Sequence, residues 1–532
     1  MSKGRVLIVD DKPDMRSTLS GLLSDREYLV RSAASLPEAL QLLQTERFHV
    51  AVLDVRLDDS DEDNQDGLSL MRAINEIDPS VAVIILTGYA TVRMVQEALQ
   101  PDAEGRSPAY SFLEKTEITR LPAQVRGAFD NALRINDALV IEDPENFIPR
   151  VANKIRFVST ARPGAEQVAE ETGEILRKLF YECERIEVRP MKRGYSGAAV
   201  LAVTPWYRGR GRGEVRVAKI GEHGLVEKER NKYRQLVQGI VGGYRLPQTL
   251  QFARTRSLSG ILYTFAGLGA SRDFAVFYRE ADLSRVLSAL DNLFLRTCFP
   301  WRRGEITLCP DLDLRETYMK LLRLKPEVMH CSLEHMLAGR HPFRLEGQTI
   351  WLGSDIPLTD PIEFALFADL RADTQIAIIH GDLYGYNVLV DERDETWLID
   401  FAATDRGPLL QDYASFETFT RFLLVDSNDW QQLYEWAALS YGAADLSRVE
   451  LPPRLAAIPE IAKAHAVIQR IRTLALSDLD SAAQRSYLIG VLFNAIKVLT
   501  VMNMEPTCRD HALITAAVVA ERLCHEGKTS SL

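Results

Sequence analysis

The sequence predicts an α/β protein in two parts: a domain with a doubly wound parallel sheet, followed by a two-lobed α+β fold. In the first part, five short apolar runs alternate with five amphipathic helix patterns, which is typical of a parallel sheet with helices on both faces. A strand-rich stretch follows from about Ile186 to Ala266. Beyond Gly267 the patterns are mainly helical, so a small β lobe precedes a large helical lobe.

The N-terminal domain is predicted element by element from these patterns. The expected strands are Val6–Val9, Leu29–Arg31, Val50–Leu53, Val81–Leu86 and Ser111–Leu113. The expected helices are Asp14–Leu23, Leu36–Gln44, Leu68–Ile77, Val92–Leu99 and Leu121–Leu139, the last of them stopped by Pro144. In a sheet of this kind the reactive site lies at the carboxyl ends of the strands.

Four segments are expected along the chain. They are the N-terminal domain (1–139), a helical connector (140–180) with an amphipathic run at Ala165–Leu179, the small β lobe (181–267) and the helical lobe (268–532). Some hundred residues separate the end of the small lobe from His380, too many for a plain loop, so they are expected to fold as helices and a small β patch.

Composition excludes several classes of protein. The net charge of −11 argues against direct binding to nucleic acid, which needs a concentrated positive surface. No Cys-x-x-Cys pair occurs among the six cysteines, so neither a zinc site nor a disulfide framework is expected. The apolar stretch Tyr487–Met502 is too short for a membrane span and is interpreted as a buried helix. We expect a cytoplasmic protein without membrane contact.

Five polar residues follow the ends of predicted strands: Asp10, Asp11, Asp54, Thr87 and Lys115. The sheet topology would bring them to one edge. Clustered carboxylates are costly without a cation, and Mg²⁺ prefers oxygen ligands, so Asp10, Asp11 and Asp54 are expected to bind Mg²⁺. Asp54 is then the predicted nucleophile toward a phosphoryl group. Thr87 and Lys115 are expected to contact the phosphoryl oxygens.

The segments around these residues resemble the response-regulator receiver family over residues 3–138. They read Leu7-Ile-Val-Asp-Asp11, Ala51-Val-Leu-Asp54, Ile85-Leu-Thr87-Gly88 and Phe112-Leu-Glu-Lys115. The resemblance implies a flavodoxin-like fold and phosphorylation of Asp54 by a cognate histidine kinase. It also implies a switch in which Thr87 and Phe112 reposition.

Two features depart from that family pattern. Thr116 follows Lys115 where the family usually has proline, and the loop after Asp54 is long and acidic (58–66). The loop is interpreted as a solvated insertion, with an effect on phosphate lifetime or metal affinity as the alternative.

A second constellation lies in His380-Gly-Asp-Leu-Tyr-Gly-Tyr-Asn387, followed by the strand Val388–Val390 and by Asp400-Phe401. This matches the H-x-D-L-x-x-x-N and D-F pattern of kinase catalytic loops. Phosphoryl transfer needs one carboxylate to orient the acceptor hydroxyl and oxygen ligands to hold Mg²⁺ on the phosphates. Asp382 is the expected base, and Asn387 and Asp400 are the expected metal ligands.

The β lobe supplies the predicted nucleotide contacts. The turn at Gly194, Ser196 and Gly197 is expected to lay backbone amides over phosphates. Alternation in Val215-Arg-Val-Ala-Lys219 places Val217 and Lys219 on one strand face, to cover an adenine and to reach phosphates.

The helix predicted at Val226–Val237 is expected to carry the carboxylate that orients Lys219. Glu229 is the first choice and Glu227 the second, and the sequence alone leaves both open.

These motifs resemble the aminoglycoside phosphotransferase and choline-kinase-like family over roughly residues 181–420. Asp412-Tyr-Ala414 is similar to that family's buried Asp-Leu-Ala anchor, whereas Asp400-Phe-Ala402 lacks the glycine of D-F-G. Gly381 stands where protein kinases have arginine, and no A-P-E segment follows. The resemblance implies a protein-kinase-like fold, ATP or GTP, Mg²⁺ and a hydroxyl acceptor.

The sequence thus predicts a response regulator in which phosphorylation of Asp54 controls a kinase-like output domain, with a small-molecule acceptor favoured. A catalytically silent nucleotide-binding scaffold and a protein Ser/Thr kinase are the alternatives. The expected partners are a histidine kinase and an unidentified phosphate acceptor, with a homodimer as a further option.

Overall fold

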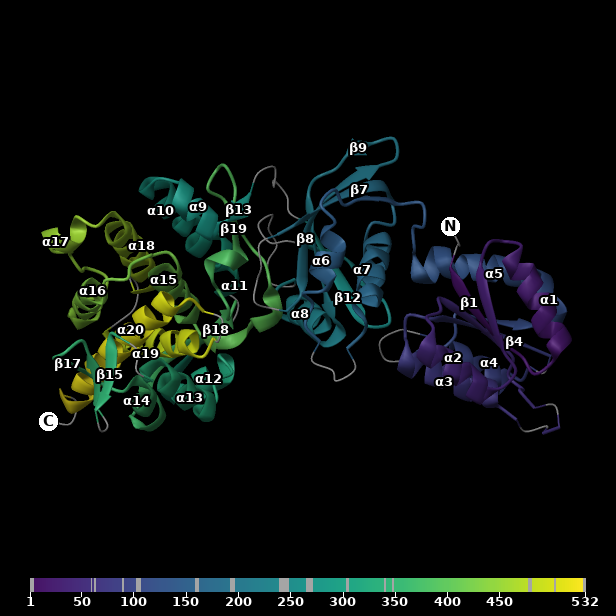
Figure 1. Cartoon of the computed structure of the whole chain (residues 1–532), viewed down its shortest axis with the longest axis horizontal. Helices are drawn as coiled ribbons and strands as arrows, with labels where there is room; N and C mark the ends of the chain where they lie inside the picture. The colour runs from purple at the N-terminus through teal and green to yellow at the C-terminus, as the bar shows by residue number, and fades with distance from the viewer. Residues whose placement is uncertain are drawn as a thin grey trace. The chain divides into compact units, whose positions relative to one another are not determined.

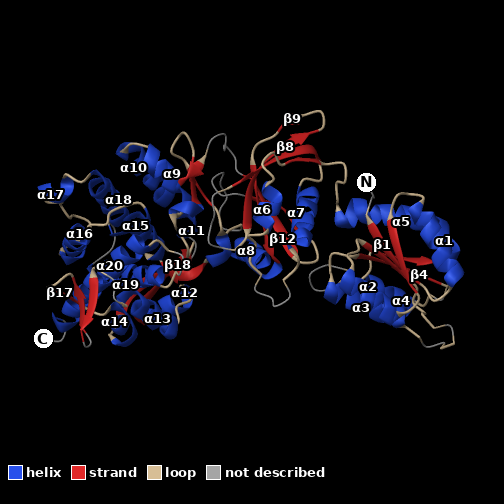
Figure 2. Ribbon diagram, in the orientation of Figure 1, coloured by secondary structure: helices blue, strands red, loops and turns tan. Residues whose placement is uncertain are grey.

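The computed structural model describes residues 4–529, apart from 59, 62–63, 89, 102–106, 158–161, 192–196, 239–247, 265–270, 303–305, 339–340, 347–348, 477–480 and 502–503. The chain forms two compact units. The first contains Met1–Glu227 and Thr249–Thr264, and the second contains Lys228–Gln248 and Phe265–Leu532. Figures 1 and 2 show the elements of both units.

A five-stranded parallel sheet in the order β2-β1-β3-β4-β5 forms the N-terminal domain. Its strands are β1 (Arg5–Val9), β2 (Leu29–Ala33), β3 (Val50–Leu53), β4 (Ala82–Thr87) and β5 (Ser111–Glu114). Its helices are α1 (Pro13–Ser24), α2 (Leu36–Thr45), α3 (Asp66–Ile77), α4 (Val92–Leu99) and α5 (Leu121–Gly127). The doubly wound fold predicted from the sequence is confirmed.

Side-chain alternation along each strand builds a core on both faces of this sheet. In β1, Val6 and Ile8 pack on the face covered by α1 and α5. Leu7 and Val9 pack on the face covered by α2, α3 and α4. Figure 1 shows the two helix layers on opposite sides of the strands. Strands buried on both faces need unbroken apolar runs, which is why β1 could be predicted from the sequence.

The last helix of this domain is shorter than predicted. α5 ends at Gly127 and continues as one wider turn over Ala128–Leu133. Arg134 then takes a left-handed backbone conformation with φ of 49°, which ends the helix well before Pro144. The helix prediction to Leu139 was therefore wrong at its C-terminal end.

A seven-stranded sheet makes up the rest of the first unit, in the order β11-β12-β10-β8-β7-β6, with β9 paired to β8. Its strands are β6 (Val140–Glu142), β7 (Cys183–Pro190), β8 (Ala199–Tyr207), β9 (Gly211–Arg212), β10 (Arg216–Glu222), β11 (Gln248–Arg254) and β12 (Leu258–Thr264). The connector was expected to be helical, but it begins with β6, which pairs with β7 in parallel.

Two helices of the connector precede β7: α6 (Phe147–Ala152) and α7 (Ala165–Leu179). The amphipathic run predicted at Ala165–Leu179 is confirmed as α7. Its apolar side packs on the sheet, where Ile175 and Leu179 share one core with Ala218 and Ile220 of β10. A Cβ on Gly260 in β12 would lie 2.3 Å from Ile175, so helix and sheet approach closely there.

The second unit is mainly helical. After α8 (His223–Leu236), which begins in the first unit, its helices are α9 (Phe274–Glu280), α10 (Leu283–Asp291), α11 (Phe299–Arg302), α12 (Leu314–Leu321), α13 (Pro326–Leu337), α14 (Pro361–Phe367), α15 (Gln411–Leu423), α16 (Trp430–Gly442), α17 (Pro453–Ala456), α18 (Pro459–Leu476), α19 (Ser481–Leu499) and α20 (Pro506–Thr529). No helix in the described part of the chain is both long and apolar enough to span a membrane.

Three small antiparallel sheets complete this unit: β13-β19-β20, β14-β18-β21 and β15-β16-β17. Their strands are β13 (Arg272–Asp273), β14 (Thr307–Asp313), β15 (Phe343–Glu346), β16 (Thr349–Leu352), β17 (Ile356–Leu358), β18 (Arg371–Ile379), β19 (Val388–Val390), β20 (Thr396–Leu398) and β21 (Asp405–Pro408). The β patch predicted near Phe343–Trp351 is present as β15 and β16.

A buried ionic hub lies in the core of the second unit. Glu417 of α15 accepts two hydrogen bonds from Arg472 of α18, at 2.8 and 2.7 Å. It also accepts hydrogen bonds from the hydroxyls of Tyr441 and Tyr487, both at 2.6 Å. All four residues are fully buried, so this one carboxylate ties α15, α16, α18 and α19 together.

Candidate functional site

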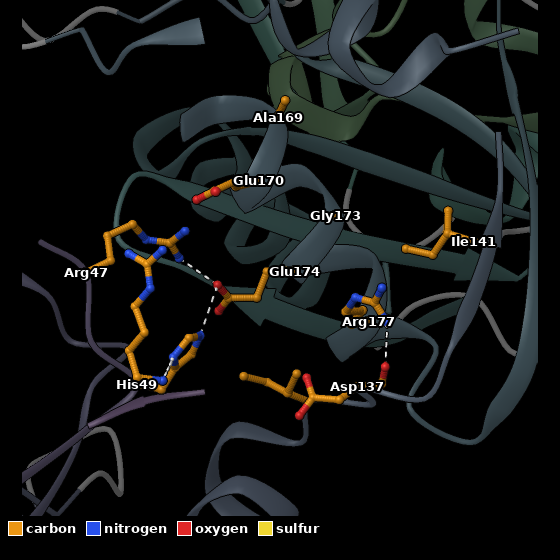
Figure 3. Close-up of a pocket in the computed structure, with 11 residues that line it drawn as sticks. Arg47, His49, Asp137, Ile141, Ala169, Glu170, Gly173, Glu174 and Arg177 are labelled. Carbon is orange, nitrogen blue, oxygen red and sulfur yellow. Dashed lines mark hydrogen bonds and ion pairs between the residues drawn. The ribbon is translucent and has the colours of Figure 1, made fainter. Parts of the chain in front are cut away.

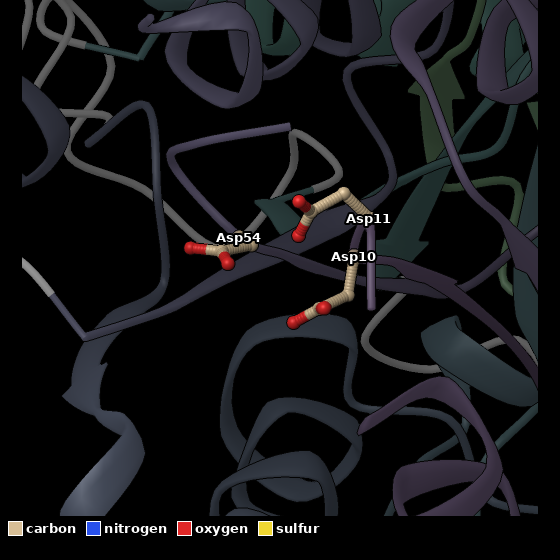
Figure 4. Close-up of side chains that lie close together, drawn as sticks. All are labelled: Asp10, Asp11 and Asp54. Carbon is tan, nitrogen blue, oxygen red and sulfur yellow. The ribbon is translucent and has the colours of Figure 1, made fainter. Parts of the chain in front are cut away.

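Three carboxylates converge at the carboxyl ends of β1 and β3 (Figure 4). One oxygen each from Asp10, Asp11 and Asp54 lie within 4.8 Å of one another. Asp10 and Asp54 are buried, at 1% and 6% exposed. The sequence prediction that these three residues meet is confirmed.

The backbone around the cluster is held by specific hydrogen bonds. The Asp54 amide donates to the Val9 carbonyl at 2.8 Å. Arg16 of α1 donates to the carbonyls of Asp10 and Asp11, at 2.7 and 2.9 Å. Arg16 was not identified from the sequence, because a guanidinium that binds backbone oxygens leaves no motif.

Lys115 lies against the same carboxylates. Its Nζ is 2.6 Å from Asp10 Oδ2 and also bonds to Asp54. Burial disfavours the ammonium, but the bonds to Asp10 and Asp54 outweigh it and raise the pKa of Lys115. Burial raises the pKa of Asp54, opposed by Lys115 and by a hydrogen bond from Thr87. The predicted positions of Lys115 and Thr87 beside Asp54 are therefore confirmed.

The donor set suits Mg²⁺. Asp11 Oδ1 and Asp54 Oδ1 are both buried and have no hydrogen-bond partner among the described residues. A buried carboxylate oxygen is costly to leave unsatisfied, and a hard divalent cation is the ligand that such oxygens bind. A bound Mg²⁺ would compensate the clustered negative charge and leave Asp54 as the nucleophile toward a phosphoryl group.

Phe112 lies in β5, partly buried, and packs against the core on the α2–α3–α4 face. Whether it moves with Thr87 on phosphorylation stays a prediction. In the acidic loop, Asn64 Oδ1 accepts from the amides of Leu57 and Asp66, at 3.0 and 3.2 Å, just before α3 begins.

The predicted nucleotide contacts of the first unit lie on β10. Val217 and Lys219 are 3% and 4% exposed, and they point away from the face on which Ala218 and Ile220 meet α7. Gly197 has a φ of 78°, which favours glycine. Gly194 and Ser196 lie outside the described residues.

The two candidate carboxylates of α8 differ in their surroundings. Glu227 pairs with Arg254 at 3.3 Å on the surface. Glu229 is fully buried, and its Oε1 accepts a hydrogen bond from the Phe401 amide at 3.2 Å. Burial singles out Glu229, while its role toward Lys219 stays a prediction.

Asp412 holds the backbone of the segment that resembles a catalytic loop. This buried carboxylate accepts from the amides of His380 and Gly381, at 2.9 and 3.0 Å. Gly381 has a φ of 80°, and a Cβ there would lie 2.5 Å from the Ala403 carbonyl. Asp412 is 1% exposed, while its role as the anchor of a kinase-like fold stays a prediction.

Asp382, Asn387 and Asp400 are placed around the hairpin of β19 and β20. The Asn387 side-chain amide donates to the Asp382 carbonyl at 2.8 Å. The Ile399 amide donates to the Asn387 carbonyl at 3.0 Å, at the end of the hairpin. Asp400 follows with a φ of 68°, a left-handed conformation that few residues other than glycine adopt, although aspartate does so more readily than most.

Two further residues of the second unit respond to the charge of Asp382. Burial lowers the pKa of Lys497 in α19, and the carboxylate of Asp382 opposes this shift. Burial and the same carboxylate raise the pKa of Tyr384. Lys497 was not predicted as a site residue, because it is more than a hundred positions from the loop.

Comparison with known proteins gives two family matches. Residues 6–116 match the response regulator receiver domain, and residues 184–323 and 325–500 match ternary complex associated domain 9. The chain is 32% identical over 145 residues to the response regulator protein PilR of Pseudomonas aeruginosa, covering 27% of this chain and 29% of PilR. It is 32% identical over 110 residues to the nitrogen assimilation regulatory protein NtrX of Azorhizobium caulinodans, covering 21% of this chain and 22% of NtrX.

The match is therefore confined to less than a third of the length of these two relatives. Among solved structures, the receiver domain of NtrX from Brucella abortus is 26% identical, with a TM-score of 0.20, and covers 24% of this chain and 98% of that one.

The fold and the acidic site together define the class of the N-terminal domain: residues 6–116 form a response-regulator receiver domain. The ternary complex associated domain 9 model matches more than half of the residues, and the chain belongs to that family. Neither family description names a kinase.

Proposed function

We propose that the receiver, phosphorylated on Asp54 by a cognate histidine kinase, controls a C-terminal domain that binds ATP or GTP with Mg²⁺ and transfers its terminal phosphoryl group to a hydroxyl. A small-molecule acceptor is favoured, because Gly381 stands where protein kinases have arginine and no A-P-E segment follows.

The observation that carries the proposal is the arrangement around Asp382. Asn387 is tied to the Asp382 backbone, and Asp400 follows the same hairpin in a strained conformation. Phosphoryl transfer needs little covalent chemistry from a protein, only a base near the acceptor and oxygen ligands for Mg²⁺. These three side chains are of the types required: Asp382 would orient the acceptor hydroxyl, and Asn387 and Asp400 would hold the metal.

A non-catalytic binding role is the second candidate. It is favoured by the family description, which refers to association with a ternary complex. In that case the second unit would bind nucleotide without turnover and act as a scaffold.

Nucleotide binding is tested first. ATP with Mg²⁺ should raise the unfolding midpoint of the full chain, since a ligand at one hundred times its Kd stabilises the folded state by about 2.7 kcal/mol. Because the receiver is itself expected to bind Mg²⁺, each shift is the midpoint with ATP and Mg²⁺ minus the midpoint with Mg²⁺ alone. Asp400→Ala should remove the Mg²⁺ dependence of this ATP shift, whereas Asp445→Ala, at an exposed aspartate of the same unit, should not. Equal Mg²⁺-dependent shifts in both variants would mean that Asp400 holds no metal.

A phosphotransfer screen then separates the candidates. Labelled ATP is offered with small hydroxylated molecules and, separately, with candidate proteins. Transfer that is lost in Asp382→Asn supports the kinase, and the acceptor class identifies which kind. Binding without transfer to any acceptor supports the scaffold.

A further inference from the structure

The receiver contacts the rest of the first unit through a charged joint at the amino-terminal end of β3. Figure 3 shows Arg47 and His49 pointing toward Glu174 of α7. Arg47 Nη2 lies 2.6 Å from Glu174 Oε2, and His49 Nε2 lies 3.6 Å from the same oxygen. The side chains of Arg47 and Glu174 are only 16% and 11% exposed, so solvent screens this contact weakly.

A neighbouring carboxylate extends the joint to the second sheet. Glu171, fully buried on α7, lies 3.8 Å from Arg47. Its Oε2 accepts hydrogen bonds from the Thr255 hydroxyl and the Ser257 amide, at 2.7 and 2.8 Å, in the turn between β11 and β12. In the same turn, Arg256 donates to the Leu43 carbonyl of α2 at 2.9 Å.

The path from this joint to Lys219 is short. α7 packs on β12 at Gly260, and β12 pairs with β10 in a register that sets Ile261 opposite Lys219. Lys178 of α7 also donates to the Arg254 carbonyl at the end of β11, at 2.7 Å. A shift of α7 would therefore displace β12 and, through it, β10, the strand that carries Lys219.

The other end of the joint leads to Asp54. His49 directly precedes β3 and Asp54 directly follows it. The His49 amide donates to the Arg5 carbonyl, and the Asp54 amide donates to the Val9 carbonyl, so both ends of β3 are fixed to β1. A strand pinned at both ends moves as a rigid piece, which is how a change at one end reaches the other.

Two receiver elements, α4 and β5, offer no comparable route among the described residues. No hydrogen bond or ion pair found there links α4 or β5, the strand of Phe112, to a residue beyond 139. The segment after α5 does contact the rest of the unit: Asn136 donates to the carbonyls of Tyr181 and Cys183, and Arg177 of α7 donates to the carbonyls of Asn136 and Leu139. The sequence-based expectation that the signal passes through the face of Phe112 and the last helix therefore stays a prediction. The Arg47 joint differs in that it adjoins β3, the strand that ends at Asp54.

We propose that the contact of Arg47 with Glu174 and Glu171 is the joint through which the phosphorylation state of Asp54 acts on β10 and Lys219. Only one part of this inference rests on the proposed function, namely the effect on nucleotide binding at Lys219. The joint itself is a property of the receiver, α7 and the second sheet.

The test uses the full chain loaded with beryllofluoride and Mg²⁺, with loading at Asp54 verified by fluorine NMR. Amide hydrogen exchange is followed in α7, the β11–β12 turn and β10. Loading should change exchange in these segments by about five-fold or more in the wild type, the lower end of usual allosteric coupling. Arg47→Met should abolish that change while still binding beryllofluoride.

The matched control is Arg31→Met. Arg31, like Arg47, is a receiver arginine that pairs with a glutamate, here Glu46 at 2.8 Å. The Arg31 side chain is 61% exposed, however, and both partners belong to the receiver. Its exchange response should equal that of the wild type. If Arg47→Met does not fold, Glu174→Gln removes the same ion pair from the other side and should give the same loss of response.

A response in the Arg47 or Glu174 variant equal to the wild-type response would overturn the proposal, as would a loaded wild type whose α7 exchange does not change. ATP affinity is measured on the same samples. If α7 and β10 respond through Arg47 but no sample binds ATP, the joint is supported and the proposed nucleotide site is wrong.

Discussion

A Cβ atom on Gly67, at the start of α3, would lie 1.9 Å from the carbonyl oxygen of Asp54. The Gly67 amide also donates to the Val55 carbonyl at 3.0 Å. The loop that follows the phospho-acceptor thus returns to touch its backbone, and only glycine allows this approach.

Gly67→Ala should therefore disturb the acceptor. A methyl group at this position forces α3 or the Asp54 backbone to move, and overpacking of this kind costs about 1–3 kcal/mol of stability. We expect slower labelling of Asp54 by acetyl phosphate, read by mass spectrometry after reductive trapping, and a lower unfolding midpoint. Gly21→Ala is the control, since nothing lies within 4 Å of a Cβ at Gly21 in α1. Equal labelling rates in both alanine variants would contradict the role of Gly67.

Asp412→Asn should loosen the loop of Asp382. Each carboxylate oxygen of Asp412 accepts one backbone amide, and an asparagine can replace only one of these acceptors. A buried amide left without an acceptor costs about 1–3 kcal/mol. The expected result is a lower free energy of unfolding and weaker stabilisation by ATP.

The control for this substitution is Asp429→Asn, at the exposed start of α16. There a single oxygen accepts from the amides of Gln431 and Gln432, and asparagine can do the same. Similar stability losses in the two variants would show that the two-oxygen contact of Asp412 is not special.

Glu417→Gln should be among the most destabilising substitutions in the second unit. It leaves the buried guanidinium of Arg472 without its counter-charge, and breaking a buried pair in this way costs about 3–5 kcal/mol. Denaturant unfolding at neutral pH measures the loss. Glu346→Gln is the control, because Glu346 pairs with Arg344 on the surface, where such pairs contribute about 0–1 kcal/mol.

The effect of Glu417 should depend on pH. Burial opposes ionisation, but Arg472 outweighs it and holds the pKa of Glu417 below its usual range in the folded state. The stabilisation is then complete above the unfolded pKa and is lost as the pH falls through the lower, folded pKa. The difference between wild type and Glu417→Gln should shrink in acid, and a difference that stays constant down to pH 3 would contradict this account.

The sequence by itself determined the receiver fold and the acidic site. Parallel strands buried on both faces must be apolar throughout, so β3 was predicted with the bounds that the structure has. The helical spacing of apolar residues likewise predicted the bounds of α4. The residues that follow such strands meet at one edge of the sheet, which is why the sequence alone predicted that Asp10, Asp54 and Lys115 lie together.

The tertiary structure alone decided contacts that link distant positions. Gly67 lies against the backbone of Asp54, and Arg16 binds the backbone oxygens of Asp10 and Asp11. The carboxylate of Asp382 acts on the pKa of Lys497, more than a hundred positions away in α19. The early end of α5 depends on the backbone conformation of Arg134, a residue that favours helices by propensity. The joint of Arg47 with α7 likewise spans more than a hundred positions. Local patterns specify elements, because they reflect which face of each element is buried, but they carry no record of which faces meet.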